Sequence, residues 1–549
     1  MATGAETKKP ASMVLVVAAS AAGTAFEWYD FFLFVPLAAI ISKTFFAGLN
    51  DAAGYIFALG AFAAGFAFRP IGALIFGRIG DRVGRKGTFL ITMGLMGAAT
   101  FAIGLLPTYN QVGIASPIIF LCLRLAQGTA LGGEWGGAAI YIAEHTSPDR
   151  RGFLGSWLGG SAAFGLAGAL LAVLAVRAVV GDEAFAAWGW RIPFLGSAFL
   201  LAISIWIRLK LSESPLFQQM RDEGTRSEKP YVESFLVWKN LKRVLIVLFS
   251  LMFAQGAVWY TVFFYGQFFM ENVIKLEPAT VGLLMLALVA VSVPLYLFFG
   301  WLSDRVGRKI VMVSGMILAT VAFFPAFHLI THTGNPVLDR AVTTSPVVVV
   351  ADPAECSLQF DPIGKSQFRT SCDIAKSVLA ASGVSYRNER APAGQLAQVR
   401  VGSAVVTSTD GRKLDAAALK LAKADATARI KAALTAAGYP TKADPAQTHT
   451  AQLFLVMLVL VIGATALYGP QAAALVELFP TRIRYTALSL PYHIGTGWVG
   501  GFLPASAYAM VAATGDIYFG LWYPVVATTI AIVATLVFLP ETRGKDLNF

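Results

Sequence analysis

Long apolar runs, separated by short polar or charged loops, fill most of the chain. A helix needs roughly 20 mainly apolar residues to cross the hydrocarbon core of a bilayer. Twelve runs are about that long or longer, so the pattern predicts an all-α polytopic membrane protein with twelve transmembrane helices. They lie near residues 13–42, 52–76, 88–106, 116–144, 153–178, 190–209, 243–270, 278–299, 309–330, 451–475, 485–511 and 517–539.

One polar stretch of mixed charge, residues 333–450, interrupts this series between the ninth and tenth runs. Two segments in it, 347–350 and 397–407, favour strands. Two others, 372–382 and 414–437, favour helices. We therefore expect a small soluble α+β insert with a modest core of its own.

The insert contains two of the three cysteines, Cys356 and Cys372. If it faces an oxidising compartment, these cysteines are expected to form a disulfide, with two unpaired thiols as the alternative. An extracytoplasmic partner could bind through this insert, which could equally be a lid, a substrate-capturing domain or an assembly aid.

A charged loop occurs twice with almost the same sequence. Residues 77–86 read GRIGDRVGRK and residues 300–309 read GWLSDRVGRK, an offset of 300 − 77 = 223. Such a repeat between hydrophobic segments indicates two pseudo-symmetric six-helix halves with function at their interface, an architecture typical of transporters. The expected organisation is a tail at 1–12, the first half at 13–210, a linker at 211–242, and the second half at 243–332 and 451–549.

Composition and charge support a membrane location. The chain is 56% hydrophobic and only 14% charged, which leaves too few charges to cover a soluble protein of 549 residues. Basic residues gather in the loops on one side, whereas the loops 107–115 and 512–516 on the other side contain none. By the positive-inside rule both termini are cytoplasmic and the insert is extracytoplasmic, so we expect a bacterial inner-membrane protein with a periplasmic insert. The net charge of +11 follows largely from this asymmetry, and no compact basic domain indicates nucleic-acid binding.

The repeated DRVGRK loop resembles the signature loop of the major facilitator superfamily. Further motifs narrow the resemblance to the metabolite:proton symporter family, which includes permeases for α-ketoglutarate, shikimate, citrate, and proline or betaine. The motifs are EWYDF at 27–31, RPIG at 69–72, RLAQG at 124–128, GGEWGG at 132–137, WGWRIPF at 188–194 and ESP at 213–215. The resemblance covers nearly all of the chain outside the insert and implies a symporter that couples a solute to protons.

Acidic residues in the first half are candidates for proton coupling, because an ionised group at mid-membrane must face a cavity or a partner. Glu27 and Asp30 are three residues apart and share one face of a helix. Asp30 is the leading candidate for the coupling carboxylate, and a permanent ion pair with a cation of the fourth helix is the alternative. Glu134 could carry a second proton or form half of an ion pair. Glu144, near the cytoplasmic end of the same helix, is expected to be solvated.

Arg124 supplies the cation, and Gln127 follows one turn later. The guanidinium could clamp a substrate carboxylate or neutralise Asp30 in its absence, and competition between these partners would couple binding to proton movement. The resemblance also associates this R-x-x-Q-G position with proton transfer. Arg124 is therefore a candidate for both roles.

Polar and aromatic residues of the second half are expected to line the substrate cavity. Amphipathic rings can close around an organic solute and donate single hydrogen bonds. Ordinary packing is the alternative for each of them, and for His493 a proton relay is a further reading. The candidates are Gln255, Trp259, Tyr260, Gln267, Tyr468, Gln471, Tyr492 and His493.

The repeated loops are interpreted as a gate between the halves. Gly77 and Gly300 allow close helix contact, and Asp81 and Asp304 can face a helix N-terminus, where the dipole favours negative charge. For Asp81 the resemblance points to the start of the eleventh helix, near Arg482, Arg484 and Tyr485. The other gate candidates are Arg82, Arg85, Arg305 and Arg308.

Together these features predict a secondary active transporter that imports a small organic solute with protons by alternating access. No nucleophile–base pair, metal-ligand cluster or nucleotide motif indicates an enzyme, and no cofactor or metal is expected besides the coupling proton. A carboxylate is the favoured solute because Arg124 offers a clamp, and a zwitterionic osmolyte such as proline or betaine is the second choice. A membrane sensor that binds a ligand through the insert without transporting it is the alternative from another class.

Overall fold

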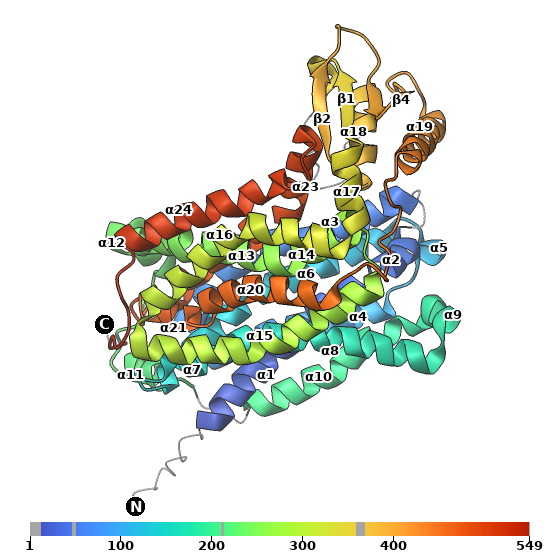
Figure 1. Ribbon diagram of the computed structural model, residues 1–549. Coiled ribbons are helices and arrows are strands. Elements are labelled where there is room, and N and C mark those ends of the chain that lie inside the picture. The colour runs from blue at the N-terminus through green and yellow to red at the C-terminus, as the bar shows by residue number, and fades with distance from the viewer. Residues whose placement is uncertain (1–12, 47–50, 210–212, 358–367, 548–549) are drawn as a thin grey trace, which may run out of the picture.

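Helices form most of the protein, and the longer ones run side by side in one bundle from which the insert projects (Figure 1). The computed structural model describes residues 13–46, 51–209, 213–357 and 368–547. The expected tail at 1–12 lies outside these ranges.

The part of the chain before residue 210 folds into long helices with short ones at the turns. The first expected run is divided at Leu33, three residues before Pro36, because proline cannot donate the main-chain hydrogen bond that would continue the helix past Phe32. The helices are α1 (Met13–Phe32), α2 (Phe34–Phe45), α3 (Asp51–Arg82), α4 (Arg85–Leu105), α5 (Tyr109–Val112), α6 (Ala115–His145), α7 (Arg151–Gly155), α8 (Trp157–Val180), α9 (Asp182–Ala184) and α10 (Arg191–Leu209).

The part after residue 213 is less regular. Between Trp238 and Val273, α-helical segments alternate with π-helical turns, which are frequent at functional sites. Another π-helical stretch, Ile494–Gly500, separates α22 from α23. The helices are α11 (Pro215–Asp222), α12 (Trp238–Val247), α13 (Phe253–Tyr260), α14 (Gly266–Phe268), α15 (Pro278–Val306), α16 (Arg308–Gly334), α20 (Thr450–Tyr468), α21 (Gln471–Val476), α22 (Arg484–His493), α23 (Leu503–Thr514) and α24 (Trp522–Phe538).

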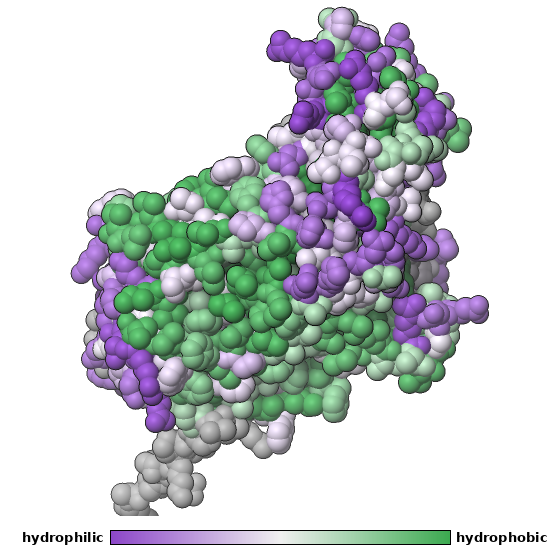
Figure 2. Space-filling view, in the orientation of Figure 1, coloured by the Kyte–Doolittle hydropathy of each residue, from purple (hydrophilic) through white to green (hydrophobic). Residues whose placement is uncertain are grey.

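The outer surface of the bundle is apolar enough for lipid. Nine helical segments within the described ranges are long and apolar enough to cross a membrane. Figure 2 shows a broad hydrophobic band over the bundle, between one hydrophilic end and the hydrophilic insert. Many large apolar side chains of the bundle helices are exposed, among them Val179 (85%), Phe199 (70%) and Leu283 (70%). Soluble proteins rarely expose so much apolar surface. The chain is therefore a multi-pass membrane protein.

The insert between α16 and α20 contains a four-stranded mixed sheet. Its strand order is β2-β1-β3-β4, with β1 parallel to β2 and antiparallel to β3, and β3 antiparallel to β4. The elements are α17 (Pro336–Thr344), β1 (Val347–Ala351), α18 (Ser371–Ala381), β2 (Tyr386–Arg390), β3 (Gln398–Val401), β4 (Ala404–Thr407) and α19 (Ala416–Ala436). The predicted disulfide between Cys356 and Cys372 is present.

Two sequence predictions for the insert need correction. The single strand expected at 397–407 is wrong, because the chain reverses at Gly402, whose φ of +56° suits a tight hairpin, and two strands result. Strand β2 was not expected, because it is an edge strand whose residues are exposed apart from Tyr386. A polar sequence of this kind carries no alternation that would predict a strand.

The insert is attached to the bundle through the C-terminal end of α23. Four successive carbonyl groups there accept hydrogen bonds from insert residues. The donors are the Tyr386 hydroxyl to Ala512, Lys376 Nζ to Ala513 at 3.2 Å, Asn388 Nδ2 to Thr514 at 2.8 Å and the Tyr386 N–H to Gly515 at 2.7 Å. The last carbonyls of a helix lack partners within it, so the insert caps α23.

Candidate functional site

Each repeated loop carries an aspartate that binds the start of a helix in the other half. Asp81, at the end of α3, accepts the N–H of Tyr485 at 3.2 Å on Oδ1 and that of Thr486 at 2.9 Å on Oδ2. This is the helix start to which the resemblance points. Gly77 makes the approach possible, because a Cβ there would lie only 2.9 Å from the Thr486 Cα.

The second copy repeats this arrangement with the halves exchanged. Asp304, at the end of α15, accepts the N–H of Gly152 at 2.9 Å on Oδ1 and that of Phe153 at 2.8 Å on Oδ2, at the start of α7. A Cβ at Gly300 would lie 2.5 Å from the Gly152 carbonyl oxygen. Both contacts lie at the end of the bundle opposite the insert (Figure 1). We call these two aspartate contacts the paired latches.

Buried arginines connect the paired latches to two glutamates. Arg85 Nη1 lies 3.3 Å from Asp81, and Arg308 Nη1 lies 2.5 Å from Asp304. Arg308 also reaches Glu477 at 3.4 Å.

The second of these glutamates is Glu144, which binds Arg484 at 2.9 Å and lies 3.7 Å from Arg85. The expectation that Glu144 is solvated is wrong, since it is only 8% exposed. The gate candidates Arg82 and Arg305 have exposed side chains.

Aromatic side chains from both halves meet between the halves. Trp135 of α6 stacks on Tyr492 of α22, with ring centroids 3.8 Å apart and planes inclined by 5°. The hydroxyls of Tyr492 and Tyr468 lie 3.0 Å apart, and Trp259 Nε1 donates to the Tyr296 hydroxyl at 2.9 Å. All five rings are buried, and together they form what we call the aromatic cluster.

A cation that the sequence did not single out lies beside the aromatic cluster. Arg69 of α3 is 0% exposed, and its Nη1 donates to the Tyr260 hydroxyl at 3.4 Å. Its guanidinium also lies 5.5 Å from the Trp28 ring and 5.4 Å from the Phe66 ring. Within the described ranges, Arg69 Nε and Nη2 have no hydrogen-bond partner. Arg69 therefore offers charge and spare donors in an aromatic setting.

Three further candidates of the second half are also buried. Gln471 and His493 are 0% exposed and Gln255 is 3% exposed. Both polar side-chain atoms of Gln471 and Oε1 of Gln255 lack a hydrogen-bond partner in the part of the chain that the structure describes. Gln267 donates instead to Glu271 at 2.9 Å and is only partly buried.

The first half contains a compact cluster of two carboxyl groups and one guanidinium. Glu134 Oε1 lies 2.5 Å from Arg208 Nη2, and its Oε2 accepts the Thr92 hydroxyl at 3.2 Å. The carboxyl of Glu27, 3% exposed, lies beside that of Glu134. Glu134 is thus half of an ion pair with a second carboxyl group next to it.

Asp30 and Arg124 are connected through two polar side chains. Thr100 lies beside Asp30, and its hydroxyl donates to the Met96 carbonyl at 2.9 Å and accepts Gln127 Nε2 at 2.7 Å. Gln127 Oε1 in turn accepts Arg124 Nη1 at 2.7 Å. The Arg124 guanidinium also lies 4.8 Å from the Phe31 ring.

Comparison with known families identifies the bundle. The family model of the Major Facilitator Superfamily matches residues 20–346. The chain belongs to the major facilitator superfamily. A related model, of the MFS_1 like family, matches residues 245–537.

Similar proteins place the chain in the metabolite:proton symporter branch of the superfamily, as the motifs predict. It is 35% identical over 321 residues to the proline/betaine transporter of Salmonella typhimurium, a match that covers 57% of this chain and 64% of that protein. It is 36% identical over 316 residues to the putative proline/betaine transporter of Staphylococcus aureus strain COL, covering 57% and 67%. The match therefore spans less than two thirds of the Salmonella relative.

A solved structure has the same fold. The proton:xylose symporter XylE, bound to 6-bromo-6-deoxy-D-glucose, superposes with a TM-score of 0.64 at 15% identity, covering 98% of each chain. The Salmonella and Staphylococcus relatives are named transporters, which agrees with the prediction that this superfamily member is not an enzyme.

Sequence reasoning missed two of the residues that the fold brings to these sites. Arg69 lies within an apolar run, so the rule that selected Asp30 and Arg124 would also have selected it. Arg208 was missed because it is next to the basic linker and resembles an ordinary charged helix end. Only the fold places it against Glu134.

Proposed function

We propose that this protein is a secondary transporter that takes up a zwitterionic solute, such as proline or a betaine, together with protons. Arg69, buried between aromatic rings at the interface of the halves, is the observation that carries the proposal. Its free donors suit the carboxylate of such a solute. The rings of Trp28, Trp135 and Tyr492 suit its cationic nitrogen, because aromatic faces attract quaternary ammonium groups.

This assignment replaces the carboxylate favoured from the sequence. That preference depended on Arg124, which lies among phenylalanine rings and is bonded to Gln127. The similarity to proline/betaine transporters supports a zwitterion instead. A solute with one positive and one negative group would also use both parts of the Arg69 site, whereas a dicarboxylate would leave the aromatic faces without a cation.

Carboxyl groups of the first half are proposed to carry the proton. In the cluster around Arg208, one guanidinium balances one carboxylate, so a proton on either Glu27 or Glu134 leaves the cluster neutral. Asp30 is the second proposed carrier, because its path through Thr100 and Gln127 leads to Arg124. Both sites are in the half that contributes Arg69, so protonation there can alter how that half holds the solute.

The proposed topology has twelve transmembrane helices. The runs at 13–42, 52–76 and 485–511, represented by α1–α2, α3 and α22–α23, would complete the nine segments. The repeated loops with their arginines would face the cytoplasm, and the insert would be extracytoplasmic. The paired latches would then close the cytoplasmic side and open when the halves rock.

Uptake into proteoliposomes tests this proposal. The solutes are labelled glycine betaine, proline and α-ketoglutarate, each with and without an inward proton gradient. We expect gradient-driven accumulation of a zwitterion, reduced at least about tenfold by Arg69→Gln through loss of a charge-assisted bond. Arg177→Gln, an exposed arginine paired with Asp182, is the matched control.

Two outcomes would contradict the assignment. Accumulation of α-ketoglutarate alone, abolished by Arg124→Gln but not by Arg69→Gln, would restore the carboxylate reading. Uptake that is the same with and without the proton gradient would refute proton coupling. If coupling exists, Glu27→Gln and Asp30→Asn identify the carrier, because the relevant variant should still exchange solute without responding to the gradient.

A further inference from the structure

The topology of the insert places its disulfide at a characteristic position. Strand β1, helix α18 and parallel strand β2 form a crossover, and β3 and β4 extend the sheet in the order β2-β1-β3-β4. Helices α18 and α19 share one face of the sheet, packed through Ile374, Leu419 and Ala426. This strand order and these directions resemble those of a thioredoxin-type fold, in which a βαβ unit carries a reactive cysteine pair.

In this chain Cys372 lies at the start of that helix, and Cys356 precedes it by 16 residues on the segment that follows β1. Cys356 follows β1, and Cys372 is in the first turn of α18, which is capped by the Thr370 hydroxyl at 3.1 Å from the Asp373 N–H. We propose that the Cys356–Cys372 disulfide is a thiol–disulfide exchange site that oxidises dithiols. The proposal goes beyond the proposed transport function and does not depend on it.

The two sulfur atoms are suited to different roles. Cys372 is 0% exposed, whereas Cys356 is partly exposed and precedes the exposed Ser357. Cys356 Sγ is therefore the sulfur that we assign to attack by an incoming thiolate. The electron pair of the broken bond passes to Cys372 Sγ, which leaves as a thiolate in the first turn of α18. The helix N-terminus favours negative charge there, and a stabilised thiolate is the better leaving group.

The exchange is balanced with a dithiol as the reductant. Its first thiolate forms a mixed disulfide with Cys356 and releases the Cys372 thiolate. Its second thiolate then attacks its own sulfur in that mixed disulfide and releases the Cys356 thiolate. The dithiol leaves as a disulfide, its two protons are released to solvent or taken by the new thiolates, and the insert gains two electrons.

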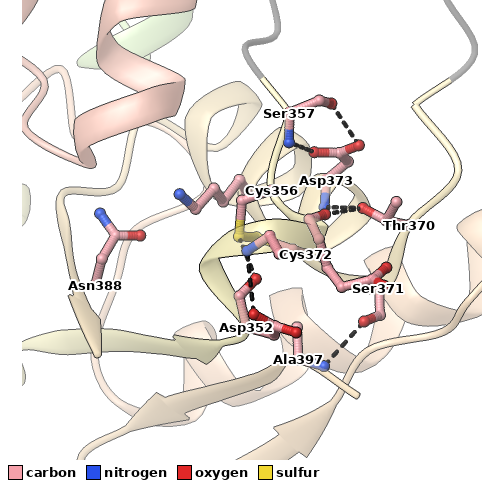
Figure 3. Close-up of a disulfide and its surroundings, with 12 residues drawn as sticks. Asp352, Cys356, Ser357, Thr370, Ser371, Cys372, Asp373, Asn388 and Ala397 are labelled. Carbon is pink, nitrogen blue, oxygen red and sulfur yellow. Dashed lines mark hydrogen bonds between the residues drawn. A yellow bond between two sulfur atoms is a disulfide. The ribbon is translucent and has the colours of Figure 1, made fainter. Parts of the chain in front are cut away.

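Hydrogen bonds beside the disulfide join the same two segments without it (Figure 3). Asp373 accepts the Ser357 N–H at 2.8 Å and the Ser357 hydroxyl at 2.6 Å. The Thr370 hydroxyl donates to the Glu355 carbonyl at 2.6 Å. These bonds would keep the two thiols adjacent after reduction, so the disulfide can re-form. If the disulfide served only to hold this loop in place, it would duplicate these hydrogen bonds.

The first test is reduction of the full-length protein in nanodiscs without denaturant. Dithiothreitol and a reduced Cys-x-x-Cys peptide serve as separate dithiols, and free thiols are trapped with a maleimide and counted by mass spectrometry. We expect Cys356 and Cys372 to be labelled together, with one dithiol oxidised per disulfide reduced. Reaction with the peptide as well would indicate protein dithiols as partners. A disulfide that opens only after denaturation would overturn the proposal.

The second test separates the two sulfurs. Cys356→Ser and Cys372→Ser both lack the disulfide, so any cost to folding is shared, and both are made with Cys122→Ser to remove the remaining thiol. We expect the Cys356 thiol of the second variant to react with an aromatic disulfide reagent at least about tenfold faster than the Cys372 thiol of the first. Equal or reversed rates would refute the assigned roles.

Discussion

Substituting Asp81 by Asn should shift the protein towards the state in which the paired latches are open. The carboxylate accepts two N–H groups at the start of α22, at 3.2 and 2.9 Å, and lies 3.3 Å from Arg85. Asparagine keeps one acceptor oxygen, but its amide group points a donor at the other N–H. Losing a hydrogen bond to a charged group costs about 1.5–3 kcal/mol. The open-to-closed ratio should therefore rise by roughly 10- to 150-fold.

The opening can be measured as a distance between spin labels on the two repeated loops. Val83 and Val306 are 67% and 46% exposed and belong to opposite halves, so Val83→Cys with Val306→Cys reports their separation. Cys122→Ser removes the other free thiol, and the Cys356–Cys372 disulfide takes no label while it remains oxidised. Asp304→Asn is the matched variant and should shift the distribution the same way. An unchanged distance distribution in both variants would refute the idea that these aspartates hold the halves together.

Three other predictions concern packing, docking and pH. Gly72→Ala should destabilise the protein by about 1–3 kcal/mol or more, because the added Cβ would lie 1.9 Å from a backbone oxygen of α6. Thermal unfolding measures this loss, and Gly94→Ala, where nothing lies within 4 Å of the added Cβ, is the control. Tyr386→Phe should weaken docking of the insert on α23 by about 1 kcal/mol, seen as faster hydrogen exchange in β2, and unchanged exchange would count against the capping role. Burial, with a smaller contribution from Lys431, lowers the pKa of Lys275 to about 8. The unfolded chain therefore binds more protons between about pH 8 and pH 10.4. The free energy of unfolding should therefore rise with pH in that window. In Lys275→Met this free energy should rise less over the same window, because the titrating group is absent.

The repeat and the hydrophobic pattern were sufficient to predict the bundle, because each is a local property of the sequence. The length of each apolar run is set by the thickness of the bilayer. The repeated loop indicates two halves even when the packing of the side chains is unknown. The break at Leu33 and the π-helical turns could not be located in this way, because the apolar pattern continues through both. In the insert, β2 escaped prediction because an exposed edge strand needs no apolar alternation.

The candidate sites were predictable only in part. The sequence selects charged residues in apolar runs but does not say which of them meet. Glu144 near a helix end was assigned to solvent, since its partner Arg484 is 340 residues away in the sequence. Arg208 at the end of α10 was missed for the same reason, because its ion pair with Glu134 forms only when α6 packs beside α10. Tertiary contact, not composition, makes these residues buried ion pairs.

The paired latches form a bivalent linkage. Asp81 of the first half holds α22, and Asp304 of the second half holds α7, so neither half supplies both contacts. When one latch opens, the other keeps the separated groups at a high effective concentration, and rebinding is favoured over full separation. Full opening thus resembles dissociation of a bivalent complex, and its rate should depend on both latches together. The opening rate should therefore rise when either Asp81→Asn or Asp304→Asn weakens one latch, and it should rise further in the double variant.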